Sequence, residues 1–85
     1  DFVHVNDVAR ANYMAATKAL TGSIYNVGSG RPITINYLAS MFDHPASYIP
    51  ERKGEAQITW ADISKIKAHL GWTPKTDIQT GLRFL

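Results

Sequence analysis

The sequence predicts a single α/β domain, residues 1–85, in which three or four helices alternate with short strands. A chain of 85 residues is too short for two separate cores. An apolar content of 45% is high enough to form one. Apolar residues recur at helical spacing in some segments, and short β-branched runs bounded by turn residues lie between them. No internal repeat divides the chain.

The first helix is expected over residues 7–20, after a short β-branched run at residues 2–5. Asn6 or Asp7 can cap its start, and the Thr-Gly pair at 21–22 can end it. One face of this helix carries small side chains that would let another element approach closely, namely Val8, Ala11, Ala15 and Ala19.

Strands are expected between the helices. Residues 23–27 are typical of a buried strand, and the Gly-Ser-Gly sequence at 28–30, followed by proline, predicts a turn. Residues 47–49 and 57–60 predict two shorter strands, with a charged turn between them.

Three further helices follow from caps and apolar stripes. Thr34 is expected to cap the second helix and Asp62 the third, which Gly71 closes. Thr76 and Gln79 have the spacing of a capping box for the fourth. The stripes of these helices are, in order, Ile35, Leu38 and Phe42; Ile63, Ile66 and Leu70; and Ile78, Leu82 and Leu85.

Charge and composition exclude several functions. Nine Lys and Arg residues are interspersed with seven Asp and Glu residues, and the longest basic run is Arg52-Lys53. This mixture is unlike the one-sided basic surface of a nucleic-acid-binding protein. Cysteine is absent, which excludes disulfides and thiolate metal sites and fits a cytoplasmic protein. No apolar run approaches the ~18 residues that span a membrane.

The motifs give no catalytic residue, no cofactor-binding residue and no metal ligand. The Gly-Ser-Gly turn lacks the third glycine of a dinucleotide loop, because Ile33 stands there, so a plain turn is the stronger interpretation. None of the four tyrosines is followed by lysine four residues later, so the Tyr-x-x-x-Lys pair of short-chain dehydrogenases is absent. The three histidines lack the i, i+4 spacing of a helical zinc site.

The charged turn at 52–55 is the best candidate for a ligand site. The guanidinium of Arg52 can hold two phosphate oxygens, and Gly54 lets the backbone come close. The carboxylate of Glu55 can accept hydrogen bonds from ribose hydroxyls. From residue types alone, a solvated charged turn is the stronger interpretation.

Four segments resemble the extended short-chain dehydrogenase family, specifically its sugar-nucleotide epimerases and dehydratases. Residues 1–9 resemble that family's Arg-Asp-Phe-Ile-His-Val-Asp-Asp-Val-Ala segment, and residues 24–30 its Tyr-Asn-(Val/Ile)-Gly-(Ser/Thr)-Gly turn. Residues 52–55 are similar to its Arg-x-Gly-Asp, and residues 61–74 to the segment that closes its substrate lobe. The four segments follow one another in the family's order and spacing.

The resemblance implies the C-terminal substrate-binding lobe of a Rossmann-type epimerase, with the nucleotide-binding half absent. It implies that Arg52 binds the substrate diphosphate, that Glu55 binds the ribose and that Phe2 lies near the nucleotide. The family's cofactor is NAD. We expect this chain to bind none, because the Gly-rich loop and the catalytic Tyr-x-x-x-Lys of the family's first half are missing.

The parent reaction expected from the resemblance is 4-epimerisation of a UDP-sugar through a 4-keto intermediate. The chain is expected to be a fragment, because it begins at Asp1 without methionine and stops at Leu85 inside a helical pattern. It is expected to be inactive, because the dinucleotide fingerprint and the catalytic pair are missing, and to have only weak UDP-sugar affinity. The alternative is a non-catalytic, self-associating binding or assembly module. A homo-oligomer or domain swap is expected in either case, through the Ala-rich face of the first helix and the last stripe, with residues 21–22 or 72–74 as hinge.

Overall fold

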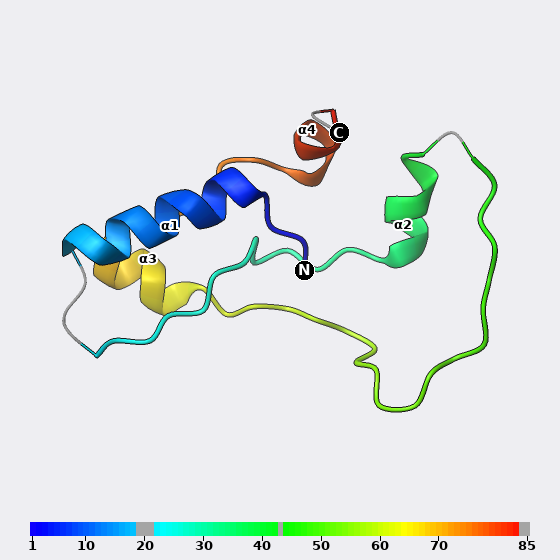
Figure 1. Ribbon diagram of the computed structural model, residues 1–85, viewed down its shortest axis with the longest axis horizontal. Helices are drawn as coiled ribbons and strands as arrows, with labels where there is room; N and C mark the ends of the chain where they lie inside the picture. Colours follow the sequence, from blue (N-terminus) through cyan, green and yellow to red (C-terminus); the bar gives the residue numbers. More distant parts are fainter. Residues whose placement is uncertain (19–21, 43, 84–85) are drawn as a thin grey trace.

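The structure is a computed structural model and describes residues 1–18, 22–42 and 44–83. Within these residues it contains four helices and no strand. In chain order the helices are α1 (Val5–Lys18), α2 (Ile35–Ser40), α3 (Ser64–Leu70) and α4 (Ile78–Leu82), and Figure 1 shows their arrangement. Ala19, Leu20, Thr21 and Leu85, which entered the predicted first helix, hinge and last stripe, lie outside the described residues.

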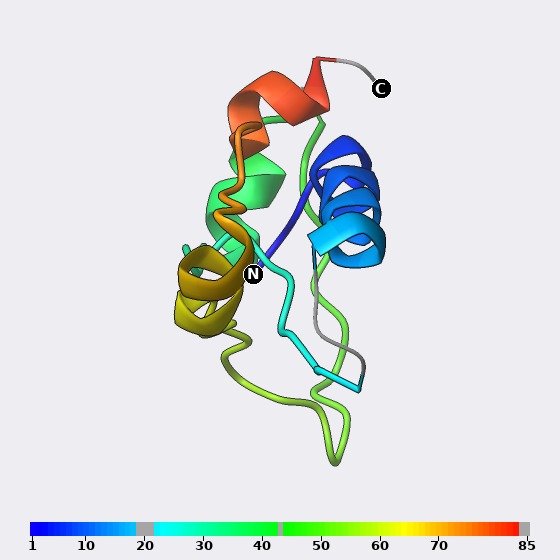
Figure 2. The ribbon, with the colours of Figure 1, turned by 90° about the vertical axis from the view of Figure 1, so that its left-hand side faces the viewer.

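The core lies where α1 crosses α3. Ala11 of α1 is 1% exposed and packs with buried side chains from α3 and the segments on either side of it, which are Ile63, Ile66, Leu70 and Trp72. Figures 1 and 2 show the two helices lying alongside each other. The small face of α1 therefore admits a close neighbour, as predicted. The expectation that this face lacks apolar cover is wrong for Ala11, because α3 and Trp72 cover it.

The expected strands are not confirmed. Apart from the N-terminal amine of Asp1, which donates to the carbonyl of Thr59 at 2.8 Å, the backbone hydrogen bonds that the described part of the chain makes outside its helices join residues three or four apart, so they form turns and helix ends. A β-ladder requires a second strand alongside the first. Residues 23–27 nevertheless alternate in exposure, with Tyr25 and Val27 packed against the core and Ile24 80% exposed. The expectation of a buried strand is therefore met only by the packing of Tyr25 and Val27, since Ile24 is exposed and the segment pairs with no strand among the residues that the structure describes.

Two of the predicted helix ends are confirmed. The side chain of Thr34 accepts a hydrogen bond of 3.0 Å from the Tyr37 amide and caps α2. Gly71 ends α3 in the left-handed conformation, with φ of 71°, and its amide donates to the carbonyl of Lys67. Glycine suits this position because other residues reach positive φ at a steric cost.

The start of α3 is one step from the prediction. Ile63 occupies the N-cap position and makes no side-chain cap. Asp62 stands just outside, where its Oδ1 accepts a hydrogen bond of 3.0 Å from the Ser64 amide and another from the Ser64 hydroxyl. The carboxylate therefore still satisfies one helix amide, but from the residue before the cap.

The capping box predicted for α4 is wrong. Asp77 is the N-cap, and its Oδ1 accepts a hydrogen bond of 2.7 Å from the Thr80 amide. The amide of Thr76 instead donates to Asp7, which holds Thr76 outside the helix. The side-chain amide of Gln79 donates a hydrogen bond of 3.0 Å to the hydroxyl of Tyr37. Tertiary contacts at both residues override the local capping pattern.

The long connection from α2 to α3 leaves the core. Every residue from 44 to 60 is exposed, and Figure 1 shows this segment extending away from α1 before it returns to α3. We call residues 44–60 the arm. The molecule measures 46 × 31 × 15 Å along its principal axes, so it is flat and elongated.

Candidate functional site

The structure divides the three predicted site residues between two places. Arg52 and Glu55 lie at the far end of the arm, where an Nη1 to Oε1 distance of 3.5 Å joins their side chains. Both are largely exposed, at 68% and 62%. Gly54 has φ of +84° and makes the tight turn that brings the pair together. The structure thus places Arg52 and Glu55 side by side, apart from the cavity that contains Phe2.

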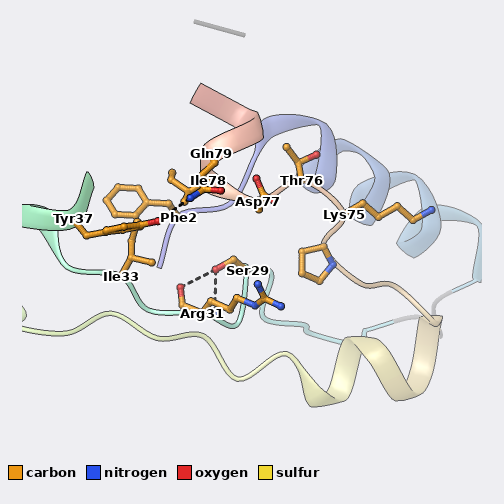
Figure 3. Close-up of a pocket in the computed structure, with 11 residues that line it drawn as sticks. Phe2, Ser29, Arg31, Ile33, Tyr37, Lys75, Thr76, Asp77, Ile78 and Gln79 are labelled. Atoms are coloured by element: carbon orange, nitrogen blue, oxygen red, sulfur yellow. Dashed lines mark hydrogen bonds between the residues drawn. The ribbon is translucent and has the colours of Figure 1, made fainter. Parts of the chain in front are cut away.

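Phe2 lines a cavity of about 470 Å³ between the turn before α2 and the segment that enters α4. Figure 3 shows Phe2, Ile33 and Tyr37 at one end of the cavity and Arg31 extending toward the other. The lining residues are Phe2, Ser29, Arg31, Ile33, Tyr37, Pro74, Lys75, Thr76, Asp77, Ile78 and Gln79. A volume of this size is in the usual range for small-molecule sites.

The carboxylate of Asp1 anchors the wall formed by the Gly-Ser-Gly turn. Its Oδ1 accepts hydrogen bonds from the amide and the hydroxyl of Ser29, at 2.8 and 2.6 Å. Its Oδ2 accepts from the amides of Gly30 and Ala61, both at 3.1 Å. The amides that would cradle a phosphate in a nucleotide-binding loop are therefore bound by a carboxylate of the same chain, in agreement with the plain-turn interpretation.

Gly28 explains why this turn packs so tightly. A Cβ atom at this position would lie 2.6 Å from the Cβ of Ala61 and 3.1 Å from Oδ2 of Asp1. Glycine is needed here because the turn, the first residue and the end of the arm approach one another too closely for a side chain.

The carboxylate of Asp7 anchors the opposite wall. Asp7 is 1% exposed; its Oδ2 accepts hydrogen bonds from the amides of Lys75 and Thr76, at 3.1 and 2.9 Å. Its Oδ1 lies 2.9 Å from Nη1 of Arg10. Burial by itself raises the pKa of Asp7, but the hydrogen bonds to its carboxylate and the charge of Arg10 outweigh this effect, and the pKa lies below its usual value.

Trp72 and Arg10 complete this anchor. The indole Nε1 of Trp72 donates to the backbone oxygen of Asp7 at 3.0 Å, and Trp72 itself is 1% exposed. The guanidinium of Arg10 lies 5.8 Å from the centre of the Trp72 ring and also donates to the carbonyl of Thr73. These contacts join the start of the 73–76 segment to α1 and so fix the position of this wall of the cavity.

Two residues of opposite charge, Arg31 and Asp77, line the cavity. The guanidinium of Arg31 makes no hydrogen bond or ion pair with the residues that the structure describes. Hydrogen bonds from Thr80, followed by the positive charges of Arg31 and Arg83, lower the pKa of Asp77. Asp77 is therefore ionised at neutral pH and can accept hydrogen bonds from a ligand.

A second cavity of about 580 Å³ lies on the other side of the Gly-Ser-Gly turn and is bounded by the end of the arm and the start of α3. The indole of Trp60 closes one edge by donating to the carbonyl of Gly30 at 2.9 Å.

Among the described residues, no group of three His, Cys, Asp or Glu residues is placed to hold a metal ion. In the same part of the chain, no helix is both long and apolar enough to cross a membrane.

Sequence reasoning missed most of this site. Arg31, Tyr37 and Gln79 were not singled out as ligand contacts, and Asp7 was read only as a possible helix cap. The buried contacts of Asp7 join residues 65 to 69 positions apart, and local spacing carries no signal for such pairs. The Asp1 contacts had one available signal, since Asp1 and the Gly-Ser-Gly turn both belong to segments that resemble the family.

No protein-family model matches the chain. Curated proteins match it along almost its whole length. The chain is 36% identical to the UDP-glucuronate 4-epimerase of Thermodesulfobacterium geofontis and 36% identical to a putative UDP-glucose 4-epimerase of Methanocaldococcus jannaschii, covering 98% of this chain and 28% of each relative. It is 30% identical to the dTDP-glucose 4,6-dehydratase of Escherichia coli, covering 96% of this chain and 28% of that enzyme.

The fold of the chain is also similar to that of a solved epimerase structure. The crystal structure of the UDP-glucose 4-epimerase of Thermotoga maritima with UDP-glucose superposes with a TM-score of 0.88 at 37% identity, covering 98% of this chain and 28% of that one. The chain thus spans little more than a quarter of the length of the proteins it matches. The resemblance read from the sequence is confirmed: the chain belongs to the family of nucleotide-sugar 4-epimerases and 4,6-dehydratases and corresponds to their C-terminal part.

Proposed function

We propose that the chain forms the nucleotide-sugar-binding part of an NAD-dependent UDP-sugar 4-epimerase. The observation that carries this proposal is its fold similarity, at a TM-score of 0.88, to an epimerase crystallised with UDP-glucose. The 4-epimerases of T. geofontis and M. jannaschii, at 36% identity, favour epimerisation over dehydration. The parent reaction would invert C4 of the sugar through a transient 4-keto intermediate.

The residues present do not fit NAD. The Gly-Ser-Gly turn, the glycine-rich segment closest to a dinucleotide loop, has its amides bound by Asp1, and the sequence contains no Tyr-x-x-x-Lys pair. In this proposal, the cofactor and the catalytic pair belong to the remaining three quarters of the longer enzyme. The chain alone binds the substrate without turning it over.

Arg52 and Glu55 are the proposed contacts to the substrate diphosphate and ribose. Their exposure leaves both side chains accessible, and a pair separated by 3.5 Å in water is weak enough to open when a phosphate arrives. Phe2 is the proposed aromatic contact near the nucleotide; it lines the cavity and is 40% exposed.

The proposal is tested by titrating the chain with UDP-glucose, UDP and NAD while recording amide spectra. We expect saturable, weak shifts with the two uridine nucleotides, none with NAD, and no epimerisation of UDP-glucose in a coupled assay. Saturable NAD binding in the micromolar range, or turnover of UDP-glucose, would contradict the proposal that cofactor binding and catalysis belong to the rest of the longer enzyme. Absence of any response to UDP-glucose would contradict the substrate-binding role.

The second candidate is a non-catalytic module that associates with itself. The observation favouring it is the exposure of large apolar side chains, since Ile24, Tyr48 and Ile58 are 80%, 82% and 72% exposed. Surfaces of this kind usually mark contacts between proteins. A mutant of these residues that stays monomeric and retains UDP-glucose binding would favour the first function over the second.

A further inference from the structure

We propose that Asp1 and Trp60 are positioning residues for nucleotide-sugar binding, because together they fix the arm relative to Phe2. The inference rests on the proposed function, which assigns one ligand to two places that the structure separates. Phe2 lines the cavity of about 470 Å³, whereas Arg52 and Glu55 lie at the far end of the arm. A ligand that contacts both places gains affinity only if their separation is held at a value that it can span.

The carboxylate of Asp1 joins the end of the arm to the Gly-Ser-Gly turn. Its Oδ2 accepts the amide of Gly30 and the amide of Ala61, the residue that follows the arm, both at 3.1 Å. The turn and Ala61 leave no space between them, because a Cβ atom at Gly28 would lie 2.6 Å from the Cβ of Ala61. Phe2 is bonded directly to Asp1, so one residue connects the proposed aromatic contact to the arm.

Trp60 makes a second attachment at the same place. Its indole Nε1 donates to the carbonyl of Gly30 at 2.9 Å, so the amide of Gly30 is bound by Asp1 and its carbonyl by Trp60. We call Asp1, Gly30, Trp60 and Ala61 the junction. Trp60 is 68% exposed and contributes little buried surface, so its hydrogen bond to the turn is the contact through which it acts.

Contacts within the arm make its far end a closed loop. The side-chain amide of Gln57 donates to Oε1 of Glu51 at 3.1 Å, and the loop between them contains Arg52 and Glu55. At the other end of the arm, the hydroxyl of Tyr48 donates to a side chain of α2 at 3.4 Å, which is long for a hydrogen bond. The position of the loop relative to the cavity therefore depends on the junction.

The binding experiment compares UDP, which reaches both places, with inorganic pyrophosphate, which reaches only the arm. Trp60→Phe keeps an aromatic ring but removes the donor to Gly30. We expect it to weaken UDP binding about fivefold, which is the net contribution of one neutral hydrogen bond, and to leave pyrophosphate binding unchanged. Asp1→Asn should weaken UDP binding more, with the same selectivity, because it removes a charged acceptor. Tyr13→Phe, at an exposed aromatic residue of α1, should change neither affinity.

A second measurement needs no ligand. The sequence contains no cysteine, so cysteines introduced at Lys53 in the arm and at the exposed Ala16 of α1 can carry two nitroxide labels. Pulsed electron paramagnetic resonance then gives the distribution of distances between the labels. We expect a narrow distribution in the parent and a broader one in Trp60→Phe and Asp1→Asn, because the arm loses an attachment in each.

Three results would overturn the positioning role. They are an unchanged distance distribution in both variants, unchanged UDP binding in Trp60→Phe, and an equal loss of UDP and pyrophosphate binding in Trp60→Phe, which would indicate a general loosening of the fold. Each of them leaves the proposed substrate-binding role standing if the parent chain binds UDP. No response of the parent to UDP would contradict the proposed function itself, and the positioning role with it.

Discussion

Asp1 and Asp7 act in the same way at the scale of single residues, because each carboxylate accepts backbone amides from segments distant in the sequence. Asp1 joins the first residue to the Gly-Ser-Gly turn and to Ala61, and Asp7 joins α1 to the entry of α4. Such a carboxylate is hard to replace, because its loss leaves several amides without acceptors in a place shielded from water.

We expect Asp7→Asn to lower the free energy of unfolding by roughly 2 kcal/mol at pH 7. The change removes the charge that pairs with Arg10 and places an amide donor among other donors. Urea denaturation followed by circular dichroism measures this loss. Asp62→Asn is the control, because Asp62 also accepts a backbone amide but is exposed, and it should cost less.

The same residue predicts a pH dependence. The folded-state pKa of Asp7 lies below that of the unfolded chain, so its contribution to stability is fully present above the unfolded value of about 3.9. It is lost as the pH falls through the folded-state pKa. Urea denaturation between pH 6 and pH 3 should therefore show a steeper acid loss in the parent than in Asp7→Asn. If the free energy of unfolding falls with pH equally in the parent and in Asp7→Asn, Asp7 does not cause the acid loss of stability.

Arg52 carries the prediction for substrate binding. A charge-assisted contact to a diphosphate contributes about 1.5–3 kcal/mol, so Arg52→Ala should weaken UDP-glucose binding about tenfold or more. Glu55→Ala should have a smaller effect, because it would contact a neutral hydroxyl. Calorimetric titration measures both, with Lys53→Ala as a control for the loss of a neighbouring positive charge. If both variants bind like the parent, the arm turn is only a solvated loop.

At the scale of elements, the sequence predicted the helices better than their starts. Thr34 and Gly71 were assigned correctly because their roles depend on the residues next to them. Thr76 was assigned wrongly because Asp7 takes its amide, and Gln79 because Tyr37 takes its side chain. The strands are not confirmed because pairing depends on a neighbouring strand, which local sequence does not encode.

The start of α4 gives a direct test of this distinction. Asp77→Ala removes the oxygen that accepts the Thr80 amide and should lower the free energy of unfolding by about 1 kcal/mol. Thr76→Ala should lower it less, because the contact of Thr76 to Asp7 uses its backbone amide, which alanine retains. Thermal or urea denaturation of both variants compares them. If Thr76→Ala lowers the free energy of unfolding more than Asp77→Ala does, Thr76 caps α4 as the sequence predicted.

The site shows the same limit of sequence reasoning over longer distances. Phe2 was identified through the family resemblance, and it lines the cavity of about 470 Å³. Arg31 and Gln79 line the same cavity but are 48 residues apart in the numbering of the chain, and no ligand-binding motif in the sequence links them. The cavity exists because the carboxylates of Asp1 and Asp7 bring these segments together, and those long-range contacts are visible only in the fold.

At the scale of the whole molecule, the chain exposes more surface than its mass requires. Its accessible surface is 6977 Å², whereas a compact monomer of 9.4 kDa exposes about 5,000 Å². Its radius of gyration is 15.4 Å, against about 12 Å for a compact domain of this length. The arm accounts for much of the excess, since residues 44–60 are exposed and include Tyr48, Ile58 and Trp60.

We therefore predict that the isolated chain self-associates through the arm. Burying ~400 Å² of apolar surface per chain contributes about 10 kcal/mol, and association costs on the order of 4–15 kcal/mol. The balance is close, and it favours a dimer when the arms of two chains bury a larger area than this or exchange an element. Light scattering at tens of micromolar should report a dimer or larger species. Tyr48→Ser with Ile58→Ser should shift the population toward monomer, whereas Tyr13→Ser with Val5→Ser, two residues that are 71% exposed but lie outside the arm, should not. A cooperative, well-dispersed monomer of the parent chain at that concentration would contradict the prediction, because it would mean that the exposed arm needs no cover.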